Sequence, residues 1–431
     1  MTNSNLTKLF GIALFFTFGL LIVDGFIPQF KMALHGGYLP PDSFPIKLVL
    51  IGCLFLIYVS TVKIGRSANF GFVDSTKLQL IILSFAGYLT VHLLVSFLIL
   101  DRSLVVLVYS YVDALFFLFF VFPAVSLLPG VMDWRVATRI LILVSIPLCV
   151  LGLYQFIFTD TVLPTLSRDL TYRVYGWSYY GRVRAFSLFG SGLKFSFFLA
   201  LTSAVVFAYA KYLQASLLKV GLYLILGLMI VTCVATLTRN GYMTVAFSLL
   251  SVMLFHKWPR TSWTWLPLVY LAFAIFTVFL GWAISDLHGG SSAAISSSDS
   301  LSERIRLWGI HLSTWLQTDL GTMFFGTGFT QSRRFFGDDE AVIDNVFIAI
   351  GYQLGIFGLI LFVFSYCLIW LFLYKKHKEN IDNPFLTGSV AFWSTFLSSG
   401  VFNTSQNVYL LWVPLIFMVV PVEKKRIMKC A

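Results

Sequence analysis

The chain is poor in charged residues. Only 11% of its 431 residues are charged, whereas 58% are hydrophobic. Soluble domains carry about 25% charged residues, so this shortage excludes an ordinary soluble protein. Apolar runs long enough to cross a bilayer, about 20 residues each, recur along the whole sequence. We therefore predict an all-α polytopic membrane protein, with a single transmembrane domain over residues 1–431 and no soluble domain.

Cysteine and histidine are also scarce. The five cysteines lie in apolar runs or at the tail, and none forms a CxxC or another metal-like spacing. The six histidines are scattered and form no HExxH pair. We therefore expect no metal, no cofactor and no disulfide framework.

The apolar runs predict about twelve transmembrane helices. They lie near 9–27, 46–62, 78–100, 104–128, 140–158, 185–210, 217–237, 241–256, 263–284, 345–373, 384–402 and 405–421. The first run lacks a small-residue cleavage site, so we expect it to be retained. Basic residues concentrate in cytoplasmic loops of membrane proteins. Their distribution, together with an even number of spans, places both termini in the cytoplasm.

In this orientation most lysines lie inside and most arginines lie outside. Twelve lysines and five arginines fall inside, whereas three lysines and ten arginines fall outside or on outward-facing span ends. The ten outer arginines are Arg102, Arg168, Arg173, Arg182, Arg184, Arg239, Arg304, Arg306, Arg333 and Arg334. Arginine suits bidentate contact with phosphate or carboxylate, which favours an outer site for an anionic ligand. The alternative is that these arginines tolerate the interface and pair with outer acids.

Two outer loops are predicted to be long. Residues 159–184 form an arginine- and aromatic-rich loop, and residues 285–344 form a larger one that opens on a Gly/Ser-rich stretch. Within the larger loop, an amphipathic helix is predicted near 301–318. Its apolar stripe consists of Leu301, Ile305, Trp308, Leu312, Trp315 and Leu316.

Three arginines stand in distinctive local patterns. Arg184 precedes a glycine-containing span entry, and Arg239 lies in a short turn between two spans, where charge is costly unless it faces water or a partner. Arg304 shares a helix edge with Trp308 at i, i+4. The alternatives are an ordinary interfacial arginine for Arg184 and a snorkelling arginine on a surface helix for Arg304.

A polar pair, Asp344-Asn345, opens an apolar helix that carries glycines at 351, 355 and 358. Asp and Asn are favoured at helix N-caps, and we expect one of the two to be the cap. Capping does not explain the acidic residues just upstream, among them Glu340, so the pair is also a candidate site.

Taken in order, these stretches resemble the O-antigen ligase/polymerase superfamily of bacterial envelope glycosyltransferases. The pattern is an Arg before a glycine-containing span, a Ser/Thr-Arg-x-Gly turn, an Arg-x-x-x-Trp helix followed by Gly-x-Gly, and an Asn-led helix ending in Gly-x-x-Gly. The matching residues are Arg184; Thr238, Arg239 and Gly241; Arg304, Trp308, Gly326 and Gly328; and Asn345, Gly355 and Gly358. The resemblance covers roughly residues 180–365, and it implies a GT-C-like transmembrane glycosyltransferase with two long periplasmic loops.

The resemblance also implies a substrate and a mechanism. Family substrates are glycans on undecaprenyl pyrophosphate, at the periplasmic face of the bacterial inner membrane. We expect Arg184, Arg239 and Arg304 to stabilise the leaving pyrophosphate without a metal, in an inverting transfer with Asp344 as a candidate base. Further expected substrate contacts are Arg173, Arg182, Arg333, Arg334, Glu340, Asn345 and Trp308. The expected partners are the lipid-linked oligosaccharide, the bilayer and a chain-length regulator, with no nucleic acid.

One departure from the family pattern separates two enzyme hypotheses. Many ligases that attach O-antigen to lipid A core carry His directly before the motif asparagine, and this chain has Asp344 there. The difference favours an O-antigen polymerase of the Wzy type over a ligase. A hypothesis from another class is a flippase for lipid-linked oligosaccharides. A flippase should line a cavity with charges from many spans, whereas here the spans carry few charges.

Overall fold

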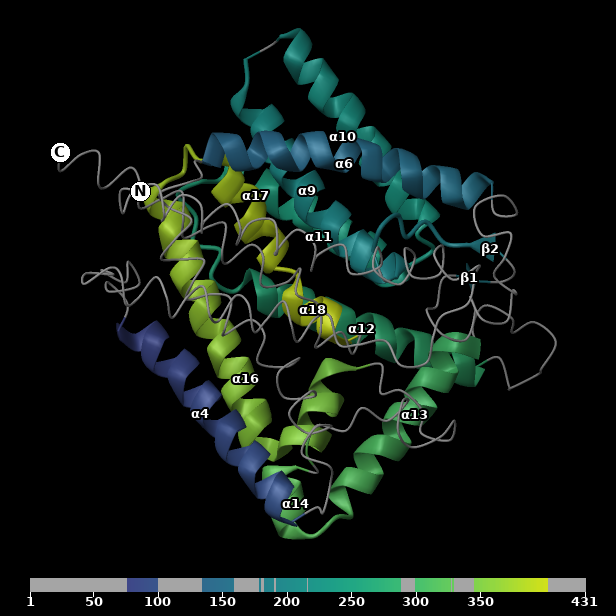
Figure 1. Cartoon of the computed structure of the whole chain (residues 1–431), viewed down its shortest axis with the longest axis vertical. Helices are drawn as coiled ribbons and strands as arrows, with labels where there is room; N and C mark the ends of the chain where they lie inside the picture. Colours follow the sequence, from purple (N-terminus) through teal and green to yellow (C-terminus); the bar gives the residue numbers. More distant parts are fainter. Residues whose placement is uncertain are drawn as a thin grey trace, which may run out of the picture.

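The computed structural model describes residues 76–99, 134–158, 178–179, 182–189, 191–214, 216–287, 299–326, 328 and 345–401. In this part the protein is helical, apart from a ribbon in which β1 (Ser178–Tyr179) pairs antiparallel with β2 (Arg182–Val183). The helices are α4 (Thr76–Ile99), α6 (Trp134–Ile157), α9 (Gly192–Tyr212), α10 (Leu217–Ala235), α11 (Arg239–Lys257), α12 (Leu266–Leu287), α13 (Asp299–Leu316), α14 (Leu320–Phe325), α16 (Val346–Glu379), α17 (Pro384–Trp393) and α18 (Phe396–Val401) (Figure 1).

Four of the described helices are long and apolar enough to cross a membrane, namely α6, α9, α10 and α16. Helices α4, α11, α12 and α17–α18 coincide with four more of the predicted spans. The predicted spans near 9–27, 46–62, 104–128 and 405–421 lie outside the described residues. The prediction of a helical, polytopic membrane protein is therefore confirmed, whereas the count of twelve spans and the side of each terminus stay predictions.

Helix α9 lies at the centre of the described bundle. It packs against α6, α10, α11 and α17 (Figure 1). Phe195, Leu199 and Ala204 on this helix have no exposed surface, and a helix that is apolar on all sides is typical of a buried position. Helix α10, in contrast, leaves Leu224 largely exposed, as expected for a side chain that faces lipid.

Helices α17 and α9 approach each other closely at Gly388. A Cβ atom on Gly388 would lie 2.5 Å from the Cα of Val205 and 2.6 Å from its backbone nitrogen. Only glycine leaves room for two backbones at this separation, as is common in membrane helix packing.

Two of the predicted continuous spans are broken. Helix α16 has non-helical backbone at Gly355, with φ 70° and ψ −175°, a region that is essentially restricted to glycine. The predicted span 384–402 divides into α17 and α18, with a turn at Ser394-Thr395. Broken helices in a membrane need partners for the backbone groups that they free. At the α16 break, the Leu354 carbonyl accepts from the Tyr88 hydroxyl of α4 at 2.5 Å.

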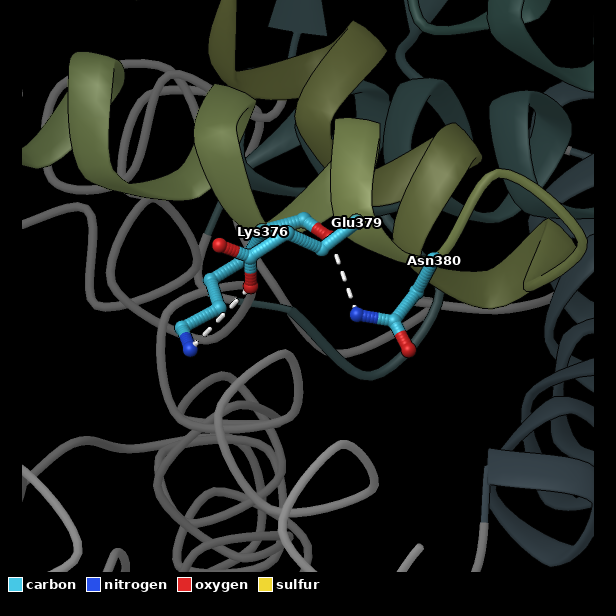
Figure 2. A network of polar contacts seen from close by, with 3 residues as sticks. All are labelled: Lys376, Glu379 and Asn380. Atoms are coloured by element: carbon cyan, nitrogen blue, oxygen red, sulfur yellow. Dashed lines mark hydrogen bonds and ion pairs between the residues drawn. The ribbon is translucent and has the colours of Figure 1, made fainter. Parts of the chain in front are cut away.

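The C-terminal ends of α9, α11 and α16 lie together at one end of the bundle. Here the Thr261 carbonyl accepts from Lys378 Nζ at 2.9 Å and from the Tyr374 hydroxyl at 3.0 Å. Figure 2 shows the last turn of α16, where Lys376 and Glu379 form an ion pair at 3.4 Å and Asn380 Nδ2 donates to the Lys376 carbonyl at 3.1 Å. We call this end of the bundle, which holds Thr261, Tyr374, Lys376 and Lys378, the basic end. It carries several of the lysines that the sequence assigns to the inside.

We predict that Gly388→Ala destabilises the protein, because the added methyl group overlaps the α9 backbone. Overpacking of this kind typically costs about 1–3 kcal/mol, which thermal unfolding in detergent would measure as a lower Tm. The matched control is Gly227→Ala on α10, where a Cβ atom meets nothing within 4 Å. That change should be neutral or raise the Tm slightly. Equal effects of the two substitutions would contradict close α9–α17 packing.

Candidate functional site

The residues that follow Arg184 are fixed by Gln155 of α6. The buried Gln155 Oε1 accepts from the Ser187 backbone nitrogen at 2.7 Å, and its Nε2 donates to the Ser187 carbonyl at 3.0 Å. Ser187 has a positive φ of 52°, which is uncommon for a non-glycine residue. The Ala185 backbone nitrogen donates to the Ala235 carbonyl at 2.9 Å. Arg184 therefore stands on a fixed segment beside the last residue of α10.

The turn before Arg239 also contains a non-glycine residue with a positive φ. Leu237 has a φ of 50°, and it and Ser187 are the two non-glycine residues with positive φ in the described part of the chain. The Thr236 and Thr238 hydroxyls share a hydrogen bond of 2.6 Å. Arg239 is the first residue of α11, and its side chain is exposed. Unfavourable backbone conformations concentrate at functional sites, and both of these lie within three residues of a predicted arginine.

Glycine packing brings these two arginine segments together. A Cβ atom on Gly192 would lie 3.0 Å from the Thr236 carbonyl oxygen and 3.4 Å from the Arg184 Cβ. On the other side, a Cβ atom on Gly241 would lie 2.4 Å from the Ser196 Cβ. The starts of α9 and α11 are therefore in direct contact, and the Arg184 and Arg239 segments are neighbours.

Helix α13 (Asp299–Leu316) coincides with the helix predicted near 301–318, and part of its apolar stripe is buried. Trp308 and Trp315 are buried, whereas Leu312 and Leu316 are 40% and 57% exposed. Trp308 packs with Ala274 of α12 and Val401 of α18. The backbone of Arg304 lies in this helix four residues before Trp308, and its side chain is outside the described residues.

The two glycine motifs of the predicted pattern meet each other. Gly326 and Gly355 both have positive φ, and a Cβ atom on Gly355 would lie 2.1 Å from the Phe324 carbonyl oxygen. The Gly328 backbone nitrogen donates to the Gln353 carbonyl at 2.9 Å. These contacts fix α14 against the break in α16, next to the start of the 329–344 segment.

Asp319 is the one carboxylate between α13 and α14 in the described chain, and its role is structural. It is the N-cap of α14, where its carboxylate accepts from the Thr322 hydroxyl at 2.6 Å and from the Thr322 backbone nitrogen at 2.9 Å. The bond from the hydroxyl, followed by the backbone bond, lowers the pKa of Asp319. A carboxylate with a lowered pKa is a poor general base.

Asn345 is the N-cap of α16, as predicted for one residue of the polar pair. Its Oδ1 accepts from the backbone nitrogens of Phe347 and Ile348 at 3.0 and 3.1 Å, and its Nδ2 donates to the Val401 carbonyl at 3.1 Å. The start of α16 is therefore bonded to the end of α18.

Asn240, like Asn345, donates a hydrogen bond to α18, and the sequence did not predict this contact. Its buried Nδ2 donates to the Ser399 carbonyl at 3.0 Å, two residues before Val401. The sequence held one signal, a polar residue just inside an apolar helix. Its partner lies 159 positions away, beyond the reach of any local pattern. We call the end of the bundle that holds Arg184, Asn240 and Asn345 the motif end, and it lies opposite the basic end.

Several predicted site residues are not tested by these contacts. Asp344, Arg173, Arg333, Arg334 and Glu340 lie outside the described residues, and Arg182 is described only by its backbone in β2. In the described part, no group of three or more His, Cys, Asp and Glu side chains could hold a metal ion.

We predict that Gln155→Ala loosens the Arg184 segment, because it removes two hydrogen bonds that hold the buried backbone of Ser187. Two lost hydrogen bonds together cost about 1–3 kcal/mol, which thermal unfolding in detergent would register. The control is Gln317→Ala at the exposed end of α13, which should change stability by less than about 0.5 kcal/mol. A Gln155 variant as stable as the Gln317 variant would contradict this role.

Comparison with known families gives a match within this chain. Residues 224–363 match the family model described as O-antigen ligase. The matched region begins within α10 and ends within α16, so it includes Arg239, Arg304 and Asn345 but not Arg184. A search of curated proteins found no matching relative. The family match confirms the resemblance predicted from the motifs over residues 224–363, about a third of the chain.

Proposed function

We propose that this protein is an O-antigen polymerase, within the ligase/polymerase type of membrane glycosyltransferase that its family supports. It would transfer a growing glycan from undecaprenyl pyrophosphate to a sugar hydroxyl of another lipid-linked repeat unit. The observation that carries the proposal is the contact between the Arg184 and Arg239 segments at the motif end. We place that end at the periplasmic face of the bacterial inner membrane, because the lysine-rich basic end suits the cytoplasm.

The proposed chemistry depends on stabilising a leaving group. The bond between the anomeric carbon and the pyrophosphate oxygen breaks, and its electron pair leaves with undecaprenyl pyrophosphate. The acceptor hydroxyl oxygen bonds to the same carbon from the opposite face, which inverts the anomeric centre. Arginines that are already positioned around the pyrophosphate stabilise its negative charge without moving during the reaction, and they need no metal. Arg184, Arg239 and Arg304 are proposed for this role.

The acceptor hydroxyl also has to lose a proton. Asp344 is the proposed base, since it precedes the anchored Asn345, and Glu340 is a second candidate. Nearby arginines would lower the pKa of such a carboxyl group and weaken it as a base. We therefore assign most of the rate enhancement to the arginines. Arg173, Arg182, Arg333 and Arg334 are proposed to bind the phosphates of the donor or acceptor, and Trp308 to line the site.

The polymerase is proposed over the ligase because Asp344 replaces the histidine that many ligases carry before the motif asparagine. The ligase is the second candidate, because the matching family is described as O-antigen ligase. The proposed partners are the lipid bilayer and a chain-length regulator in the same membrane.

Replacement of Arg239 tests the arginine role directly. Purified protein given a lipid-linked repeat unit should produce a glycan ladder on a gel, and Arg239→Ala should lose about 100-fold or more of that activity. Arg260→Ala is the matched control, since Arg260 is an exposed arginine in the loop at the basic end and should leave the ladder unchanged. An Arg239→Ala enzyme with full activity would refute the assignment.

Polymerase and ligase differ in what a deletion strain makes. Without the polymerase, lipopolysaccharide should carry one repeat unit, because ligation of single units continues. Without a ligase it should carry none. Gel banding of lipopolysaccharide from the deletion strain distinguishes the two, with plasmid-borne wild-type gene as the control. Bare lipid A core would move the assignment to the ligase.

A further inference from the structure

Two asparagines from different motifs donate to the same short helix. Asn240 Nδ2 reaches the Ser399 carbonyl and Asn345 Nδ2 reaches the Val401 carbonyl, at 3.0 and 3.1 Å. Both carbonyls lie in the last turn of α18 as the structure describes it, Phe396–Val401. The last turn of α18 therefore connects the start of α11 to the start of α16.

Each asparagine directly follows a residue with a proposed role in the transfer. Arg239 precedes Asn240, and Asp344 precedes Asn345. A shift of the backbone at either asparagine moves the neighbouring residue with it. The position of Arg239 relative to Asn345 and the start of α16 thus depends on two hydrogen bonds to one helical turn.

The Asn240 bond relates Arg239 to α16, which the contacts within the turn between α10 and α11 do not do. The positive φ of Leu237, the Thr236–Thr238 hydrogen bond and the contact of Gly241 with Ser196 fix Arg239 relative to α9 and α10. Among the contacts around Arg239 described above, only the bond from Asn240 to α18 relates Arg239 to α16. Asn240 also carries a cost, because its Oδ1 is buried and has no hydrogen-bond partner among the described residues. A residue needed only for packing would avoid this cost by being apolar.

We propose that Asn240 is a positioning residue of the transfer reaction, which holds Arg239 in register with Asn345 at the start of α16 through the last turn of α18. The inference rests on the proposed function. Small misplacements of catalytic groups slow reactions by up to about 100-fold. The described bundle is built mainly on α9, α11 and α17, so loss of this bond should reduce kcat and leave the protein folded.

The test compares Asn240→Ala with Asn240→Asp in the purified full-length protein, with the lipid-linked repeat unit as substrate. Both variants lose the amide N–H, while Asp keeps the shape and an acceptor oxygen. We expect both to lose about 10- to 100-fold in kcat with KM nearly unchanged, and the unpaired Ser399 carbonyl to lower the Tm modestly while the protein stays folded. Wild-type kcat in the Asp variant, or an effect on KM instead of kcat, would overturn the inference.

The matched control is Asn380→Ala at the basic end. Asn380 Nδ2 also donates to a helix carbonyl, that of Lys376, at 3.1 Å (Figure 2). It should keep wild-type kcat. A loss as large as that of Asn240→Ala would show that any lost amide bond slows the enzyme, and it would refute a specific role for Asn240.

Hydrogen exchange separates this inference from the proposed function. Asn240→Ala should speed amide exchange in residues 238–242 and 397–401, and Asn380→Ala should not. A wild-type protein that makes no glycan ladder would contradict the polymerase proposal. Unchanged exchange in residues 397–401 would overturn the α18 connection itself, whatever the activity.

Discussion

The last turn of α18 is the contact on which the motif end depends. Its carbonyl groups would be costly to leave unpaired in a buried position, and two asparagine amides satisfy the carbonyls of Ser399 and Val401. The same turn packs Val401 against Trp308. Three of the four motifs are therefore in contact with one short helix, and the fourth, at Arg184, joins them through Gly192 and the α10–α11 turn.

The site-forming elements lie where regular structure is interrupted. The described chain departs from helical or ordinary backbone at Ser187, Leu237 and Gly355, each beside a predicted motif. Two of these interruptions are compensated by hydrogen bonds from a distant segment, between Gln155 and Ser187 and between Tyr88 and Leu354. In a membrane this compensation is obligatory, because lipid offers no hydrogen bonds.

Local patterns in the sequence predicted what is local in the structure. The helix expected near 301–318 occurs as Asp299–Leu316, and Asn345 caps α16 because its partners are only two and three residues away. The bonds of Asn240 to Ser399 and of Asn345 to Val401 join distant segments, and no periodicity encodes them. The glycines at 351, 355 and 358 look equivalent in the sequence, yet only Gly355 among them has a positive φ.

The break in α16 has a geometric consequence. Between the cap at Asn345 and the turn at Gly355, this helix forms a short strut that is bonded at both ends, to Val401 on one side and to Tyr88 through Leu354 on the other. Each inserted or deleted residue would rotate one end against the other by about 100°, and neither bond could follow. Residues between Asn345 and Gly355 can be substituted where packing allows, but residues cannot be inserted or deleted there.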